Sequence, residues 1–257
     1  MRRVTSGGCT DVGPVRAGNE DHLLLDAELG LFVVADGMGG HKAGEIASHL
    51  AVAAVVETLR TSRSTAVEST PLPGRGPLGQ AGAAGSTRRL IEALRQANAR
   101  VYNAGAADPA LLGMGTTITA LLMGADDAVI GSVGDSRAYL VRRGETVQLT
   151  HDDTWLVSML GRDGAREAAA RAHPMRHVLT SIIGSRDGTE PEVVSVPVEA
   201  GDLFVLTTDG LHNLVDDDSI GRLAASAPPE QAARGLVQEA LERRTTDNVT
   251  VVVVRVE

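Results

Sequence analysis

The chain has 257 residues, a formal net charge of −9 at pH 7, and a hydrophobic content of 43% with only 2% aromatic residues. This length forms one large domain or two small ones with a substantial aliphatic core. The negative charge argues against nucleic-acid binding, which needs clustered positive charge. The single cysteine, Cys9, excludes a disulfide framework and a cysteine-cluster zinc site. No stretch is apolar enough for a membrane span or a signal peptide, so we expect a cytoplasmic protein with no membrane association.

The first half of the chain alternates short apolar runs with helical periodicity. Residues 22–26 and 31–35 predict two strands joined as a hairpin. Apolar residues at helical spacing predict helices over 43–60 and 87–104. Residues 61–86 are almost entirely Ser, Thr, Gly, Pro, Ala and isolated charges, which predicts a mobile loop.

The second half is richer in strands. Short apolar runs with Gly and Asp between them predict an antiparallel meander, followed after an irregular stretch by a second hairpin. Two helices come next, and a final valine run without polar alternation predicts a strand covered on both faces. These elements occupy, in order, residues 116–123, 128–133, 137–142, 193–198, 202–207, 217–225, 229–243 and 249–256. Strands in hairpins and helices in separate blocks predict an α+β fold with two antiparallel sheets flanked by helices.

Acidic residues lie where the predicted strands begin or end. Asp36 directly follows an apolar run and precedes glycine, and Asp209 repeats the pattern. Because strand starts and strand ends meet at one edge of an antiparallel sheet, these acids can gather at one rim. The others at such positions are Glu20, Asp21, Asp135 and Asp247.

A rim of carboxylates is strongly repulsive unless cations are bound, and ligation by oxygen alone favours Mg²⁺, Mn²⁺ or Ca²⁺ over zinc or copper. A lone Asp-Gly pair would more often be an ordinary turn. A structural calcium site would more often come from one contiguous loop. These acids come from segments spread over the whole chain, which favours a catalytic centre.

Six sequence motifs, in a fixed order along the chain, contain the acidic residues of this rim. They are Asp11-Val-Gly-x-x-Arg16-x-x-Asn19-Glu20-Asp21, Val34-Ala-Asp36-Gly37-Met-Gly-Gly, Gly113-Met-Gly115-Thr-Thr, Val133-Gly-Asp135-Ser-Arg137, Leu206-Thr-Thr-Asp209-Gly210-Leu211 and Asp247-Asn248-Val-Thr-Val. In this order the chain resembles the metal-dependent serine/threonine phosphatases of the protein phosphatase 2C type, in the form found in bacteria. The resemblance implies a four-layer α-β-β-α sandwich. It also implies a single catalytic domain over 1–257, with a flap segment at 151–185.

The resemblance implies a role for each acid. Asp36 would bridge two metal ions, Mn²⁺ or Mg²⁺, with Asp209 and Asp247 completing one and the carbonyl of Gly37 ligating the other. Glu20 would act through water, and Asp135 with Asp209 would hold a third ion. Asp21 would orient the attacking water, and Arg16 would grip the phosphate. A metal-bridging hydroxide would then attack phosphorus in line, which needs no protein nucleophile.

The resemblance leaves the acid that protonates the leaving group open. Some family members have histidine after the Asp-Gly pair, whereas this chain has Met38, which has no proton to donate. The acid is then a metal-bound water, a mobile residue such as His41, or absent. We interpret Trp155, Met159 and His173 in the flap segment as ordinary packing residues.

The resemblance implies hydrolysis of phosphoserine and phosphothreonine in proteins, opposing cytoplasmic Ser/Thr kinases. The expected partners are phosphorylated proteins, including a cognate kinase, and we expect a monomer. The main alternative is a non-catalytic phosphoprotein-binding regulator of the same fold. Such a protein would be expected to lack some metal ligands, and Asp36, Asp209 and Asp247 are all present. A phosphatase of a sigma-factor pathway is a third possibility, although those often carry sensory or membrane regions.

Overall fold

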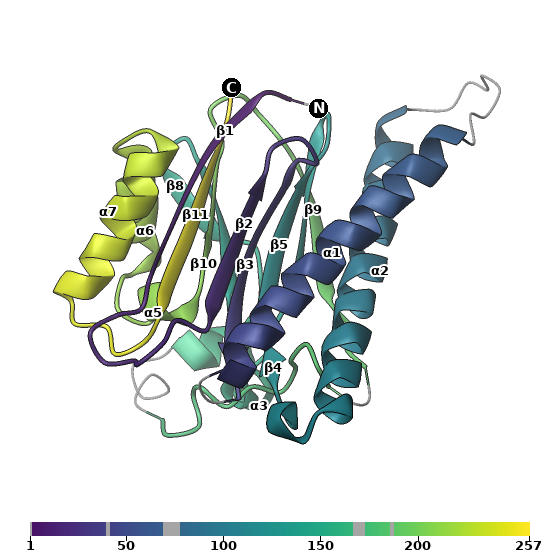
Figure 1. Ribbon diagram of the computed structural model, residues 1–257. Helices are drawn as coiled ribbons and strands as arrows, with labels where there is room; N and C mark the ends of the chain where they lie inside the picture. The colour runs from purple at the N-terminus through teal and green to yellow at the C-terminus, as the bar shows by residue number, and fades with distance from the viewer. Residues whose placement is uncertain (1, 40–41, 69–77, 167–172, 186–187) are drawn as a thin grey trace.

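Two antiparallel sheets face each other at the centre of the molecule (Figure 1). The structure is a computed structural model that describes residues 2–39, 42–68, 78–166, 173–185 and 188–257. The first sheet has the strand order β1-β11-β10-β7-β8, and the second has the order β2-β3-β5-β6-β9 with β4 paired to β3. The strands are β1 (Val4–Asp11), β2 (Asp21–Asp26), β3 (Leu31–Met38), β4 (Gly115–Thr116), β5 (Ile118–Met123), β6 (Asp127–Val133), β7 (Arg137–Arg142), β8 (Glu145–Gln148), β9 (Glu192–Pro197), β10 (Leu203–Thr207) and β11 (Val249–Val256).

Helices cover the outer face of each sheet. The long helices α1 (Lys42–Glu68) and α2 (Leu78–Ala107) pack on the second sheet, and α6 (Asp217–Ala225) and α7 (Pro229–Glu242) pack on the first (Figure 1). The other helices within the described residues are η1 (Pro109–Leu111), α3 (Trp155–Arg166) and α5 (Asp209–His212). The expected α-β-β-α sandwich is therefore confirmed. No helix within the described ranges is long and apolar enough to cross a membrane.

Strand β11 shows how the valine-rich sequence makes this fold. Val249, Val251 and Val253 pack against the helices on one side of the strand. Val252 and Val254 point the other way, into the core between the sheets. Because successive side chains of a strand point to opposite faces, a nearly continuous valine run indicates a strand buried on both faces. The prediction for residues 249–256 is confirmed.

The first pair of the predicted meander, β5 and β6, is confirmed, but its third strand and the second hairpin are wrong, because the chain crosses from one sheet to the other. Strand β6 pairs with β5 and β9, whereas β7 pairs with β10 and β8. Likewise, β9 lies in the second sheet and β10 in the first. Strands β6, β7 and β10 bury apolar side chains and β9 carries half-buried valines, so the local sequence did not reveal which sheet each one joins. These crossings bring the connection around Asp135 to the shared edge of both sheets.

The predicted loop at 61–86 is helical at both ends. Helix α1 continues to Glu68 and α2 begins at Leu78, while residues 69–77 lie outside the described residues. The hydroxyls of Thr61 and Ser62 donate to the carbonyls of Glu57 and Thr58, one helical turn back. Such bonds satisfy the hydroxyl groups of Ser and Thr inside a helix, although these residues otherwise favour loops. Composition alone therefore misplaced the ends of both helices.

Candidate active site

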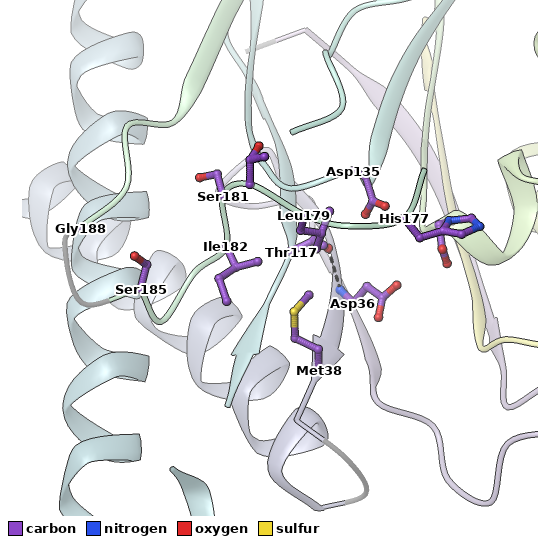
Figure 2. Close-up of a pocket in the computed structure, with 12 residues that line it drawn as sticks. Asp36, Met38, Thr117, Asp135, His177, Leu179, Ser181, Ile182, Ser185 and Gly188 are labelled. Atoms are coloured by element: carbon purple, nitrogen blue, oxygen red, sulfur yellow. Dashed lines mark hydrogen bonds between the residues drawn. The ribbon is translucent and has the colours of Figure 1, made fainter. Parts of the chain in front are cut away.

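Asp21 and Asp36 lie opposite each other in the antiparallel pair of β2 and β3. Strand β3 continues through Asp36 to Met38, so the expectation that the strand stops before Asp36 is wrong. The Asp36 backbone N–H donates to Thr117 Oγ1 at 3.0 Å, and its carbonyl accepts from the Thr117 N–H at 2.8 Å. These bonds fix the Asp36 backbone, and Figure 2 shows its carboxylate directed into a cavity.

The buried Asp21 carboxylate joins the two sheets. Its Oδ2 accepts hydrogen bonds from the hydroxyls of Thr208 at 2.9 Å and Thr250 at 2.7 Å, next to β10 and within β11. Its Oδ1 is buried and has no hydrogen-bond partner among the described residues. Burial, augmented by the charges of Asp209 and Asp247, raises the pKa of Asp21 to about 7. The motifs contain Thr208 and Thr250, but no pattern in the sequence indicated that they hold Asp21.

Asp209 begins the short helix α5 directly after β10. Asn213 Nδ2 donates to its Oδ2 at 3.0 Å, while its Oδ1 is buried without a partner in the described part of the chain. Burial and the nearby charge of Asp247 raise the pKa of Asp209 to about 6. Like Oδ1 of Asp21, Oδ1 of Asp209 is thus buried and has no hydrogen-bond donor within the described residues.

Asp135 lies in the connection from β6 to β7, where the chain passes between the sheets. Its neighbours hold this connection in place, because Gly134 exchanges two hydrogen bonds with Asp153 and Arg137 donates two to Asp152. Burial raises the pKa of Asp135 well above its ordinary value, and the charge of Asp209 adds to the shift. Burial also raises the pKa of Asp36, and the charges of Asp21, Asp209, Asp135 and Asp247 add to that shift.

The segment between β1 and β2 supplies Arg16 and Glu20, and Asp247 precedes β11. Arg16 Nη2 donates to Asp247 Oδ2 at 2.6 Å, and this bond raises the pKa of Arg16. Asn248 accepts from the Glu20 N–H at 2.8 Å through Oδ1, and its Nδ2 donates to the carbonyls of Val12 and Gly18. Asn248 therefore positions the segment that carries Arg16 and Glu20. The motif contained Asn248, but this role follows only from the structure.

The glycines after Asp36 and Asp209 permit close backbone contact. A Cβ on Gly37 would lie 2.1 Å from the carbonyl oxygen of Gly44, and one on Gly210 would lie 2.0 Å from that of Asn248. Neither distance is possible for a real side chain, so only glycine fits at either position. Gly37 thereby packs against the first turn of α1, where a Cβ on Gly44 would also meet the Glu20 carboxylate.

An open cavity of about 490 Å³ lies beside the acids. Asp36 and Asp135 lie together at one end of it (Figure 2), and Asp209 is also part of the lining. The rest of the lining is Met38, Thr117, His177, Leu179, Thr180, Ser181, Ile182, Ser185 and Gly188. Asp21, Asp247, Glu20 and Arg16 are not part of this lining, although the charges of Asp21 and Asp247 act on Asp36.

The donors suit a hard divalent cation. The side chains are carboxylates, and buried oxygens of Asp21 and Asp209 have no hydrogen-bond donor, which a cation would satisfy. In the present arrangement Arg16 holds Asp247, and no three acidic or imidazole side chains among the described residues form a finished metal site. The cluster therefore fits a cation by its chemistry, with small side-chain movements needed to close around it.

Part of the flap segment forms one wall of the cavity. His177 lines it beside Asp36 and Asp135, although no pattern in the sequence singled out this residue. Trp155 stacks on His173 with ring centroids 5.7 Å apart, as expected for packing residues. The same expectation is wrong for Met159, which is 63% exposed. His41 lies outside the described residues.

A four-layer fold with a carboxylate-lined cavity at one edge of both sheets is suited to metal-dependent hydrolysis of a phosphate ester. The family model described as protein phosphatase 2C matches residues 17–243, so the chain belongs to this family. The matched range begins just after Arg16 and ends before Asp247, and the structure places these two residues together at the site.

Similar proteins extend the comparison. The serine/threonine protein phosphatase PstP of Mycobacterium tuberculosis is 35% identical over 246 residues; the match covers 95% of this chain but 43% of PstP. The protein phosphatase PhpP of Streptococcus pneumoniae is 32% identical over 250 residues, covering 95% of this chain and 94% of PhpP. The PstP catalytic domain in complex with two manganese ions superposes with a TM-score of 0.80 at 33% identity, covering 98% of each chain.

Proposed function

We propose that this chain is a metal-dependent protein phosphatase that hydrolyses phosphoserine and phosphothreonine. The observation that carries this proposal is the set of buried carboxylates from separate segments, two with unpartnered oxygens, beside an open cavity. Membership of the protein phosphatase 2C family supports it. A buried acid cluster of this kind destabilises the fold unless cations compensate its charge, because unpaired buried charge is unfavourable.

Two core cations, Mn²⁺ or Mg²⁺, would be held by Asp36, Asp209, Asp247 and the Gly37 carbonyl, with Glu20 acting through water. Asp135 and Asp209 would hold a third. Bound there, such ions neutralise charge on a phosphoryl group and lower the pKa of water. The PstP catalytic domain with its two manganese ions supports this assignment.

Asp21 is suited to orient the attacking water. The hydroxyls of Thr208 and Thr250 fix one of its oxygens, which leaves the other oxygen, Oδ1, as a directed acceptor. Arg16 is suited to grip the phosphate, because its guanidinium stays charged and has five N–H donors. One hydrogen bond to Asp247 leaves enough donors for two parallel bonds to phosphate oxygens.

The proposed organisation is one catalytic domain over residues 1–257, with the flap segment 151–185 beside the cavity. The proposed substrates are proteins phosphorylated by cytoplasmic Ser/Thr kinases, a cognate kinase among them. We also propose that the protein acts in the cytoplasm and is a monomer. Co-purification with such a kinase tests the kinase partner, and analytical ultracentrifugation tests the monomeric state.

Hydrolysis of p-nitrophenyl phosphate tests the enzymatic proposal. We expect turnover with Mn²⁺ at mildly alkaline pH and its loss when a chelator removes the metal. A protein that binds phosphoproteins but shows no metal-dependent turnover would instead be a non-catalytic regulator of the same fold. The presence of every proposed metal ligand favours the enzyme.

A further inference from the structure

The two ends of the cavity differ in chemistry. Asp36 and Asp135 lie at one end, while Met38, Leu179 and Ile182 form an apolar wall beside them (Figure 2). Beyond this wall the described lining continues with the hydroxyls of Ser181 and Ser185. The lining next to the acids thus includes an uncharged aliphatic patch as well as the polar side chains of Thr117 and His177.

Backbone pairing builds this apolar wall. Met38 of β3 pairs with Gly115 of β4, and the next residue, Thr116, exchanges two hydrogen bonds with Ile183 at 2.9 and 3.1 Å. Gly115 leaves room for the neighbouring side chain, because a Cβ there would lie 2.7 Å from Ile182 Cδ1. Leu179 and Ile182 lie outside the helices and strands, and bridges from Leu179 to Thr154 and from Ile183 to Thr116 tie their segment to the fold.

The geometry of an extended peptide decides what this wall can contact. Side chains of alternate residues point to the same side of an extended chain, roughly 6.5 Å apart along it. A phosphoresidue that points at the acids therefore presents to the same cavity the side chain two positions away. Because Met38, Leu179 and Ile182 carry no charge, they favour an aliphatic side chain and disfavour an acidic one.

We propose that Met38, Leu179 and Ile182 select phosphoprotein substrates with an aliphatic residue two positions from the phosphorylated serine or threonine. This inference rests on the proposed function and names the substrate class of the same site. A cavity of about 490 Å³ falls in the range that binds small ligands, which leaves room for a side chain beside the phosphate.

Phosphopeptides that differ at one position test the inference. We would measure kcat/KM for phosphate release from a peptide with alanines around phosphothreonine, and from peptides with Leu or Asp substituted at position −2 or +2. At one of the two positions we expect Leu to raise kcat/KM about 10-fold over Ala, the discrimination typical of an apolar pocket. Asp at that position should lower it.

Variants of the wall must change this preference. Ile182→Ala should reduce the ratio of Leu to Ala peptides to about 2-fold, since it removes most of the aliphatic contact. Ile182→Lys should invert the preference toward Asp, a gain that loss of folding cannot produce. The control is Met159→Ala, an exposed methionine of α3 outside the cavity lining, which should keep the wild-type ratio.

Three outcomes would overturn the inference. Equal kcat/KM for the Leu and Ala peptides at both positions removes the selectivity, and a Leu preference that survives Ile182→Ala assigns it to another surface. In both cases continued hydrolysis of p-nitrophenyl phosphate would leave the proposed function standing. Wild-type protein that hydrolyses neither this compound nor any peptide would overturn the function and the inference together.

Discussion

The two ends of strand β10 carry two aspartates in opposite environments. At the start of the strand, Asp202 is 2% exposed and both of its oxygens accept hydrogen bonds from Arg142, at 2.8 and 2.7 Å. Its Oδ2 also accepts from the Glu199 N–H at 2.7 Å. Burial alone would raise the pKa of Asp202, but these hydrogen bonds hold it below its ordinary value. Just past the other end, Asp209 has one unpartnered oxygen and a pKa raised to about 6.

This difference separates a structural carboxylate from a functional one. Arg142 and a backbone N–H compensate the charge of Asp202, so the protein stabilises it without help from outside. At Asp209, burial and the charge of Asp247 outweigh the hydrogen bond from Asn213 and the charges of Arg16 and Arg137, so a cation from solution can still compensate the carboxylate. Both aspartates lie next to an end of the same strand, so the difference between them comes from the charges and donors that surround each one.

Replacing each aspartate by its neutral isostere sharpens the comparison most strongly. Asp209→Asn should lower kcat/KM for p-nitrophenyl phosphate by more than about 100-fold, the loss typical when one key electrostatic group is removed. The melting temperature should stay the same or rise, because a repulsive charge disappears. Steady-state kinetics and calorimetry check both. Near-normal turnover would show that the assigned metal centre is wrong.

The matched change at the other end of β10 should affect stability instead. Asp202→Asn removes the partner of a partly buried guanidinium and should cost about 2 kcal/mol of unfolding free energy. For a chain of this size that lowers the melting temperature by roughly 4–8 °C. Turnover at a temperature where the variant is folded should match wild type. A catalytic defect with unchanged stability would contradict the contrast.

The two environments also predict opposite pH dependence. The pKa of Asp21 is raised to about 7 and that of Asp209 to about 6, from an ordinary 3.8, so the folded state binds more protons than the unfolded chain. With a chelator present, their contribution makes the free energy of unfolding fall as pH rises from about 4 to 7. Asp202, with its lowered pKa, contributes stability that is lost as pH falls toward the acid range.

Calorimetry at several pH values with chelator measures this slope, and Asp209→Asn should flatten it. Adding Mn²⁺ near neutral pH should raise the melting temperature, because the ion binds the folded state. A metal-independent melting temperature would mean that the cluster binds no cation.

The smallest expected effect belongs to Asp135. Asp135→Asn should shift the Mn²⁺ concentration dependence of turnover by about 10-fold, as loss of an outer metal contact typically does. The activity supported by the core ions should persist. Titration of turnover with Mn²⁺, beside Mn²⁺ binding followed by calorimetry, measures the shift. An unchanged titration would reject a metal at Asp135.

The sequence by itself determined the elements with a clear hydrophobic pattern. The strands β11 and β7, which are nearly continuous apolar runs, and the helix α6, which has apolar residues at helical spacing, lie where the residues predicted them. The ordered motifs also named Asp36, Asp209 and Asp247 as candidate metal ligands. Strand ends of antiparallel sheets share an edge, so the expected gathering of acids at one rim followed from local patterns.

Only the tertiary structure decided which partners each residue has. It assigned β7 and β10 to a different sheet from β6 and β9, and it joined Asp21 to Thr208 and Thr250 across that boundary. It also pairs Asp202 with Arg142, whereas one carboxylate oxygen of Asp209 has no hydrogen-bond partner among the described residues. These contacts join residues far apart in the chain, and a local pattern records how deeply a side chain is buried but not what faces it.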